Sequence, residues 1–159
     1  MSSLARRRLL GLGATLAVTP PVLVAAPAFA AAGPMMVLWK NRGCACCTAW
    51  ARHFQEAGFS VTMHEVDDLA PARSAAGVPA DLAGCHTAQV EGYVVEGHVP
   101  LPDVQRLLAE RPAILGLAVP GMPVGSPGME VPGMAGDAYD VVAFAADGGR
   151  QVFRSILPG

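Results

Sequence analysis

Charged side chains are scarce in this chain. They make up 15% of its 159 residues, and 13 acidic residues face 11 basic ones. Nucleic-acid-binding proteins neutralise phosphates with clusters of lysine and arginine, so they carry an excess of positive charge. The opposite balance here disfavours a nucleic-acid partner.

Several familiar catalytic patterns are also lacking. No paired carboxylates, Ser-His-Asp set or glycine-rich phosphate loop stands out, and no segment repeats another. The length, with 52% hydrophobic residues, allows one domain with a substantial core. The chemistry must therefore be sought in other side chains, and the cysteines are the strongest candidates.

The chain lacks an uninterrupted apolar run of the roughly 20 residues that a membrane span needs. Its most apolar segment, Leu9–Val24, contains two consecutive prolines and follows the basic triplet Arg6–Arg8. The small residues Ala28–Ala30, with Phe29 between them, then supply an A-x-A cleavage site. We predict a signal peptide over residues 1–30, a mature domain over residues 31–159, and no stable membrane span after cleavage.

The export route is open between two alternatives. Residues Arg6–Leu10 resemble the twin-arginine signal, which exports folded proteins, whereas the general secretory route would require folding after export. Either route predicts a periplasmic or otherwise exported domain. Cleavage removes three arginines, which leaves eight basic against 13 acidic residues and a net charge of −5.

Three of the four cysteines are crowded into the segment Gly43–Thr48, as Cys44, Cys46 and Cys47, and the fourth is Cys85. Two thiolates 4 Å apart repel by about 4 kcal/mol at an effective dielectric constant of about 20. The triplet therefore needs protons, a disulfide or a cation.

Exported proteins commonly pair their cysteines in disulfides. A bridge between the adjacent Cys46 and Cys47 would be strained, and one between Cys44 and Cys46 is little better. A Cys44–Cys47 bridge is feasible, and Cys85 is then left to pair with Cys46.

The cysteine triplet lies between a predicted strand and a predicted helix. Residues 35–39 form a continuous apolar run typical of a buried strand, and residues 48–57 have helical spacing that ends before Gly58. Residues 59–66 alternate as a second strand does, which predicts a βαβ unit. A helix N-terminus stabilises anions, so thiolates in the preceding loop are favoured.

Farther along, the pattern predicts a second half of the domain. We expect a loop with one helical turn over residues 67–78, a strand over 90–96 and a helix over 102–111. A long Pro/Gly/Met-rich loop over residues 117–136 follows, too rich in proline for a helix and expected to be packed and functional. Residues 139–144 and 151–155 predict a C-terminal β-hairpin.

Four thiolates suit the soft cations Cu(I) and Zn(II) or an iron–sulfur cluster, and thioether ligands shift the preference toward Cu(I). Zinc sites generally use two pairs of cysteines with two residues between them, and this chain has one such pair. A single ion would struggle to use both Cys46 and Cys47, whereas a cluster of several Cu(I) ions with bridging thiolates can. The pattern favours such a cluster.

Several motifs together resemble one known family. They are Cys44-Ala45-Cys46-Cys47, Gly84-Cys85-His86-Thr87-Ala88, Glu96-Gly97-His98-Val99-Pro100, Gly116–Pro123 and Gly125–Glu130. On these residues the chain resembles the DUF411 family of CopG-like copper-resistance proteins. The resemblance implies a thioredoxin-like α/β sandwich, a periplasmic location and a Cu(I)–thiolate cluster on Cys44, Cys46, Cys47 and Cys85, together with copper redox chemistry.

Weaker candidates for contact with the metal are His86, His98, Met122 and Met129. Expected partners are copper ions and other periplasmic copper-handling or redox proteins. Two other functional hypotheses remain open. One is a thiol–disulfide oxidoreductase that uses Cys44 and Cys47, and the other is a structural zinc domain. Whether the protein is an enzyme is likewise open.

Overall fold

The computed structural model describes residues 33–158, and the predicted signal peptide lies outside the described residues. Among the described residues, no helix is long and apolar enough to cross a membrane. The elements, in chain order, are β1 (Met35–Asn41), α1 (Ala45–Glu56), β2 (Ser60–Val66), α2 (Ala70–Ala75), the 3-10 helix η1 (Ala80–Leu82), β3 (His86–Val90), β4 (Tyr93–Glu96), α3 (Leu101–Glu110), β5 (Gly116–Ala118), β6 (Tyr139–Phe144) and β7 (Arg150–Ile156).

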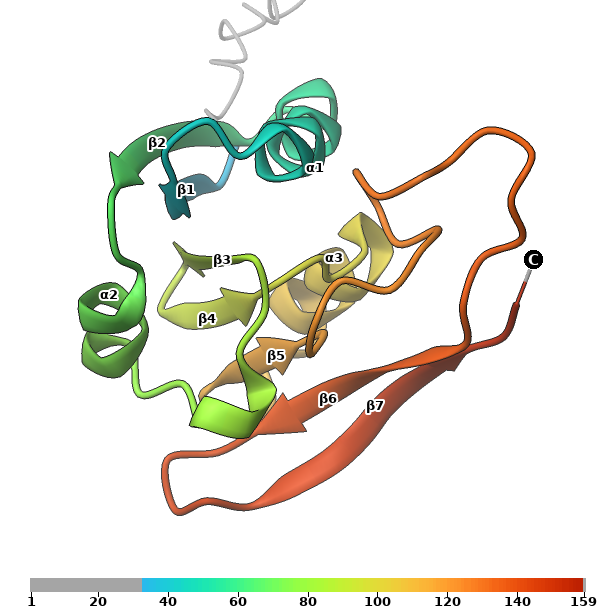
Figure 1. The fold of residues 1–159 in the computed structure, drawn as a ribbon. Helices are drawn as coiled ribbons and strands as arrows, with labels where there is room; N and C mark the ends of the chain where they lie inside the picture. Colours follow the sequence, from blue (N-terminus) through green and yellow to red (C-terminus); the bar gives the residue numbers. More distant parts are fainter. Residues whose placement is uncertain (1–32, 159) are drawn as a thin grey trace, which may run out of the picture. The chain divides into compact units, whose positions relative to one another are not determined.

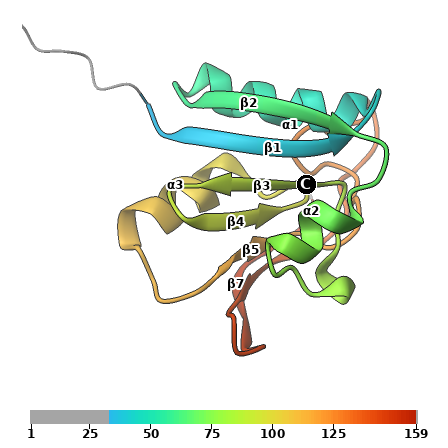
Figure 2. The same cartoon turned by 90° about the vertical axis from the view of Figure 1, so that its left-hand side faces the viewer.

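One mixed sheet joins all seven described strands in the order β2-β1-β3-β4-β5-β6-β7. The pairs β1–β2 and β4–β5 are parallel, and the other neighbours are antiparallel. The β1–α1–β2 segment confirms the predicted βαβ unit, and α1 lies alongside its two strands (Figure 1, Figure 2). The predicted C-terminal hairpin is confirmed as β6 and β7.

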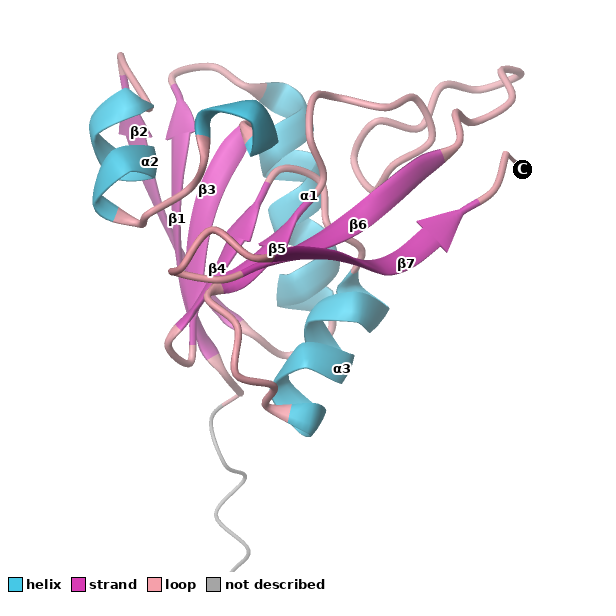
Figure 3. Cartoon of the chain, turned by 90° about the horizontal axis from the view of Figure 1, so that it is seen from below, coloured by secondary structure: helices cyan, strands magenta, loops and turns pink. Residues whose placement is uncertain are grey.

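Helices cover both faces of this sheet. Figure 3 shows α1 and α3 on one face and α2 on the other. Strand β4 illustrates the alternation, because Val95 joins the core under α1 and α3 while Val94 joins a smaller cluster with Val78 and Leu82. Burial on both faces explains the continuous apolar runs Met35–Trp39 in β1 and Tyr93–Val95 in β4.

Helix α1 begins earlier than the sequence pattern predicts. We expected Thr48 to open the helix, but Cys44 is the N-cap residue and the helix starts at Ala45. The Thr48 backbone N–H already donates to the Cys44 carbonyl at 3.4 Å. The cysteines therefore lie on the cap and the first turn, because the apolar stripe of Trp50 and Phe54 extends back to the buried Cys47.

Two further expectations need correction. The strand expected over residues 90–96 is a hairpin, since Glu91 and Gly92 both have positive φ and form the two-residue turn between β3 and β4. The first strand of this hairpin, β3, begins at His86. The Pro/Gly/Met-rich loop starts at Val119, because residues 116–118 pair with β4 and β6 as β5.

The long loop packs against the start of α1. A Cβ atom on Gly128 would lie 2.6 Å from the Cys46 carbonyl oxygen and 2.8 Å from the Trp50 nitrogen, so the glycine permits a close backbone approach. Nearby, the His98 ring is hydrogen-bonded through Nδ1 to the Pro127 carbonyl at 2.8 Å. The loop is thus packed, as expected.

Trp50 joins α1 to the rest of the core, because it is fully buried and its indole N–H donates to the Val99 carbonyl at 2.8 Å. We expect Trp50→Phe to lower the free energy of unfolding by about 2 kcal/mol or more, since it leaves that carbonyl unpaired and creates a cavity. Urea unfolding of the metal-free protein measures the change. The control Trp39→Phe, at a half-buried position, should cost less than about 1 kcal/mol. Equal losses for the two variants would contradict this role of Trp50.

Candidate metal centre

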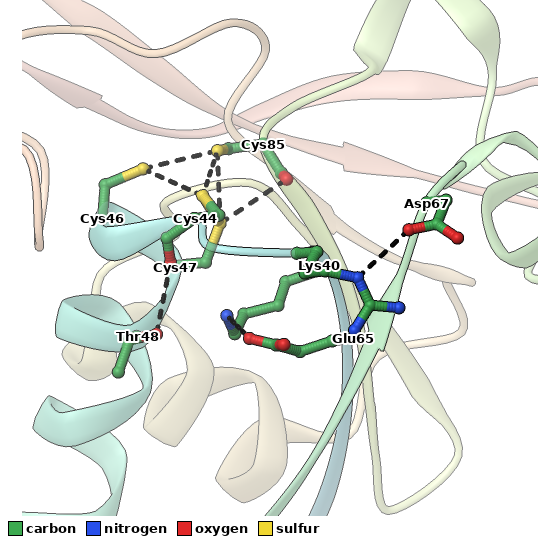
Figure 4. A network of polar contacts seen from close by, with 9 residues as sticks. Lys40, Cys44, Cys46, Cys47, Thr48, Glu65, Asp67 and Cys85 are labelled. Carbon is green, nitrogen blue, oxygen red and sulfur yellow. Dashed lines mark hydrogen bonds and ion pairs between the residues drawn. A yellow bond between two sulfur atoms is a disulfide. The ribbon is translucent and has the colours of Figure 1, made fainter.

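All four cysteine sulfur atoms converge at one point, where the start of α1 meets the turn before β3 (Figure 4). The Cys85 Sγ atom lies 3.3 Å from that of Cys44, 3.4 Å from that of Cys46 and 3.2 Å from that of Cys47. The four sulfurs all lie within 4.8 Å of one another. The structure therefore brings together the complete set of cysteines that the sequence singled out.

Cys44 and Cys47 form a disulfide, whereas Cys46 and Cys85 are free thiols. The sequence identified the Cys44–Cys47 bridge as feasible. It also left Cys46 and Cys85 as the remaining pair, and their sulfurs lie 3.4 Å apart without a bond. The site is therefore seen in a half-oxidised state, with two thiols still available.

Cys85 reaches the triplet because its loop packs closely against two neighbouring backbones. A Cβ atom on Gly84 would lie 2.5 Å from the Cα atom of Gly97 and 3.1 Å from the Val119 carbonyl oxygen. Only glycine fits that gap. The residue before Cys85 is thus selected by the approach of the backbones at the ends of β4 and β5.

The donor set fits a soft metal ion once the disulfide is reduced. In a tetrahedral site with metal–sulfur bonds of about 2.3 Å, neighbouring sulfurs are about 3.8 Å apart. The separations around Cys85, 3.2 to 3.4 Å, need to widen by only a few tenths of an ångström. Small side-chain rotations therefore suffice on the Cys85 side, whereas the Cys44 and Cys47 sulfurs must move farther apart after reduction.

The electrostatic setting of Cys85 differs from that of a cysteine at a helix N-terminus. Burial, together with a hydrogen bond and the charge of Cys46, raises the pKa of the Cys85 thiol to about 12, although the nearby Arg73 lowers it. In the metal-free, half-oxidised protein Cys85 is therefore a protonated thiol. A bound cation would have to displace that proton.

His86 and His98 lie in the core next to the cysteines. Burial lowers the pKa of both rings, so both are neutral at pH 7. The His86 ring packs against Trp50 with 4.3 Å between centroids and a tilt of 49° between the ring planes. Neither of its nitrogens has a hydrogen-bond partner among the described residues. The group of converging ligand atoms within residues 33–158 contains the four cysteines and neither histidine.

The two methionines proposed from the sequence lie in different surroundings. Met122 is 56% exposed and lines a pocket of about 400 Å³ together with Cys85, Arg73 and Asp68. Met129 is half-buried, and its backbone N–H donates to the Ser126 carbonyl at 2.7 Å. The structure thus brings Met122 to the Cys85 side of the site.

Sequence reasoning missed two charged residues beside the site, Arg73 and Glu96. Glu96 is fully buried and forms an ion pair with Arg73 at 2.9 Å. The motif that contains Glu96 was noticed, but nothing in its spacing indicates burial. Arg73 lies on a short helix that carries no recognisable motif.

Fold and site together define a mixed α/β domain with a four-cysteine centre suited to soft metals. The family model described as "Protein of unknown function, DUF411" matches residues 82–129. Two solved structures of copper resistance protein CopG, forms 1 and 2, are 41% and 40% identical to this chain, each with a TM-score of 0.73. They cover 77% and 78% of this chain, which in turn spans 97% and 98% of theirs.

The chain belongs to the DUF411 family and is a relative of CopG. The family suggested by the sequence motifs is confirmed. No curated protein matches the chain.

The raised pKa of Cys85 predicts an unusual pH profile for its alkylation. In the metal-free, half-oxidised protein we expect the rate of reaction of Cys85 with iodoacetamide to keep rising between pH 7 and pH 10.5, because the thiolate fraction keeps growing. An ordinary thiol, with a pKa of about 8.5, levels off within that range. Peptide mapping by mass spectrometry assigns the labelled cysteine.

Cys46→Ser is the control for the cause of that shift. It removes the charge of Cys46 and weakens the hydrogen bond between the two residues, so the profile of Cys85 should move to lower pH. A plateau near pH 9 in the unmodified protein would show that the thiol is not perturbed.

Proposed function

We propose that the domain over residues 31–159 is an exported Cu(I)-binding protein that contributes to copper resistance. The observation that carries the proposal is the convergence of all four cysteine sulfurs within 4.8 Å. Its relatives of 41% and 40% identity are named for copper resistance, which supports copper as the metal. Soft thiolates with a thioether nearby also favour Cu(I) over harder cations.

Several ions fit the site better than one. Cys46 and Cys47 are adjacent in the first turn of α1, so one ion cannot easily take both sulfurs in an unstrained arrangement. Thiolates that bridge two ions remove this difficulty, and several cations also neutralise the repulsion among four negative sulfurs. We therefore propose a polynuclear Cu(I)–thiolate cluster on Cys44, Cys46, Cys47 and Cys85.

Redox activity toward copper is part of the proposal. Oxidation of the Cys44 and Cys47 thiols to a disulfide releases two electrons and two protons, and the electrons convert two Cu(II) ions to two Cu(I) ions. Cys46 and Cys85 can form the second such pair, since their sulfurs lie 3.4 Å apart. The disulfide between Cys44 and Cys47 supports the oxidation step. A redox partner protein with a dithiol would supply the two electrons and two protons that return it to thiols.

The weaker site residues have secondary roles in this proposal. His86 and His98 are neutral, and we propose that they act as buried neighbours of the cluster and not as its main ligands. Met122 offers a thioether in the pocket beside Cys85. Met129 belongs to the loop whose Gly128 packs on α1. We propose Met122 as the first contact of arriving Cu(I).

We further propose a thioredoxin-like fold and a periplasmic location. The β2-β1-β3-β4 order, with β3 antiparallel to β1 and α1 between the two parallel strands, supports the fold assignment. The predicted signal peptide over residues 1–30 supports export, and other periplasmic copper-handling or redox proteins are the expected partners. The cysteine triplet at the N-terminus of α1, where thiolates are favoured, supports the redox part of the proposal.

The disulfide also favours a second candidate function, thiol–disulfide exchange through Cys44 and Cys47. That enzyme would not need Cys46 or Cys85. Insulin reduction that survives Cys46→Ser and Cys85→Ser would support the oxidoreductase instead of the copper protein.

Copper titration of the fully reduced protein under anaerobic conditions tests the first proposal. We expect more than one Cu(I) per chain, with free thiols protected in proportion, because bridging thiolates share ions. Thiol counting and metal analysis measure both quantities. Saturation at a single Cu(I) ion per chain would exclude the cluster. Retention of Zn(II) as strong as that of Cu(I) would favour the hypothesis of a structural zinc domain.

Met122→Leu tests the proposed first contact. We expect slower transfer of Cu(I) from a chromophoric chelator to the protein, by about threefold or more, with the stoichiometry unchanged. Stopped-flow absorbance follows the transfer. Met134→Leu is the matched control, because Met134 is also exposed (61%) in the same loop but does not line the pocket beside Cys85. Equal rates for the two variants would remove Met122 from the uptake path.

A further inference from the structure

A buried carboxylate lies directly behind the loop that carries Cys85. Glu96, at the end of β4, is fully buried and accepts three hydrogen bonds. The donors are the Arg73 Nε atom at 2.9 Å, the Gly84 backbone N–H at 2.8 Å and the Thr87 hydroxyl at 2.6 Å. One side chain thus contacts α2, the Cys85 loop and β3 at once.

Arg73 completes the arrangement from the other side. Its Nη2 atom donates to the Gly84 carbonyl at 2.9 Å while its Nε atom pairs with Glu96. Both backbone polar groups of Gly84 are therefore held, the N–H by Glu96 and the carbonyl by Arg73. The peptide bond that leads into Cys85 is fixed in position and orientation.

A contribution to the folding stability of the protein does not by itself explain the buried Arg73–Glu96 ion pair. Removing two charges from water costs free energy, and apolar side chains of similar size often stabilise a protein equally well. A planar guanidinium and a carboxylate do, however, set the geometry of their partners precisely enough to orient a loop. The ion pair is better explained by what it orients.

Cys85 needs such support more than the other cysteines do. Cys44, Cys46 and Cys47 are held by the cap and first turn of α1, whereas Cys85 lies on the turn between η1 and β3. Its sulfur contacts all three others within 3.4 Å. A small displacement of this turn would loosen every one of those contacts.

We propose that Arg73 and Glu96 are positioning residues that clamp Gly84 and so hold the Cys85 sulfur against the cysteine triplet. The clamp deepens the proposed function and rests on it for its consequence for copper. Its effect on the position of the sulfur does not involve a metal, so the two can be tested separately.

The metal-free test measures how readily Cys85 meets Cys46. In a Cys44→Ser, Cys47→Ser background, only the Cys46–Cys85 disulfide can form within the chain, and its equilibrium with reduced and oxidised glutathione gives the effective concentration of the two thiols. We expect Arg73→Met with Glu96→Gln to lower this concentration by about tenfold or more. Removing both charges avoids leaving one of them buried without its partner.

Arg154→Met with Asp103→Asn is the matched control. These residues form the same kind of pair, an arginine on a buried aspartate at 2.7 Å, but join β7 to α3, which carry no cysteine. We expect less than a twofold change. A fall of the same size in both double variants, or no fall in the first, would overturn the clamp.

The copper test repeats the comparison with all four cysteines present. We expect the Arg73→Met, Glu96→Gln variant to bind Cu(I) about tenfold or more weakly in competition with a chelator, as is typical for residues that orient metal ligands. With Cys85→Ser added, the same two changes should have less than a twofold effect, because the clamp acts through that sulfur. An equal loss in both backgrounds would indicate a merely structural role.

Two outcomes call for a further comparison, namely a double variant that does not fold and an unmodified protein that does not bind copper. If the double variant does not fold, Arg73→Lys replaces it under the same criteria, since it keeps the charge and removes the fork that reaches both Glu96 and Gly84. If the unmodified protein binds no Cu(I) but the glutathione experiment behaves as expected, the proposed function fails and the clamp stands.

Discussion

Repulsion between like charges is the constraint on which the rest of this structure depends. Four thiols that meet within 4.8 Å cannot all ionise without a counter-charge. The protein meets this constraint in the described state by joining Cys44 to Cys47 and by keeping Cys85 protonated through burial. Once that disulfide is reduced, a soft cation can displace the thiol protons and neutralise the crowded sulfurs.

Different contacts hold the two parts of the cysteine site, which are the triplet at the start of α1 and Cys85 on the turn before β3. Helix α1 carries three sulfurs and is anchored in the core by Trp50 and Phe54, so its geometry follows from helix packing. The Cys85 turn is flanked by the buried Leu82 and His86, and glycine contacts and the Arg73–Glu96 ion pair hold it between them. Helix packing positions the triplet, and directional polar contacts add to packing at the turn.

The sequence was most informative where hydrophobic periodicity and cysteine spacing carry the signal. It predicted the βαβ unit, the C-terminal hairpin and the four cysteines that meet. It missed the turn at Glu91–Gly92 because glutamate rarely adopts a positive φ, so the pair lacks the Asn-Gly or Asp-Gly signature of a two-residue turn. It missed β5 because three residues beside a proline-rich segment give no periodicity to detect.

The sequence could not reveal the Arg73–Glu96 pair for a different reason. A charged residue is ordinarily exposed, and only the fold brings β4 and α2 close enough to bury this one. Contacts between residues 23 positions apart have no local signature.

The close contact of Gly128 with the first turn of α1 makes the two sides of the four-cysteine site unequal. Backbone covers the helix beside Cys46, while the pocket of about 400 Å³ opens beside Cys85. The pocket that reaches the four-cysteine site therefore lies on the Cys85 side, bordered by the β2–α2 connection and the Gly121–Met122 turn. A small ligand that entered by this pocket would meet the sulfurs of Cys85 and Met122 before those of the α1 cysteines.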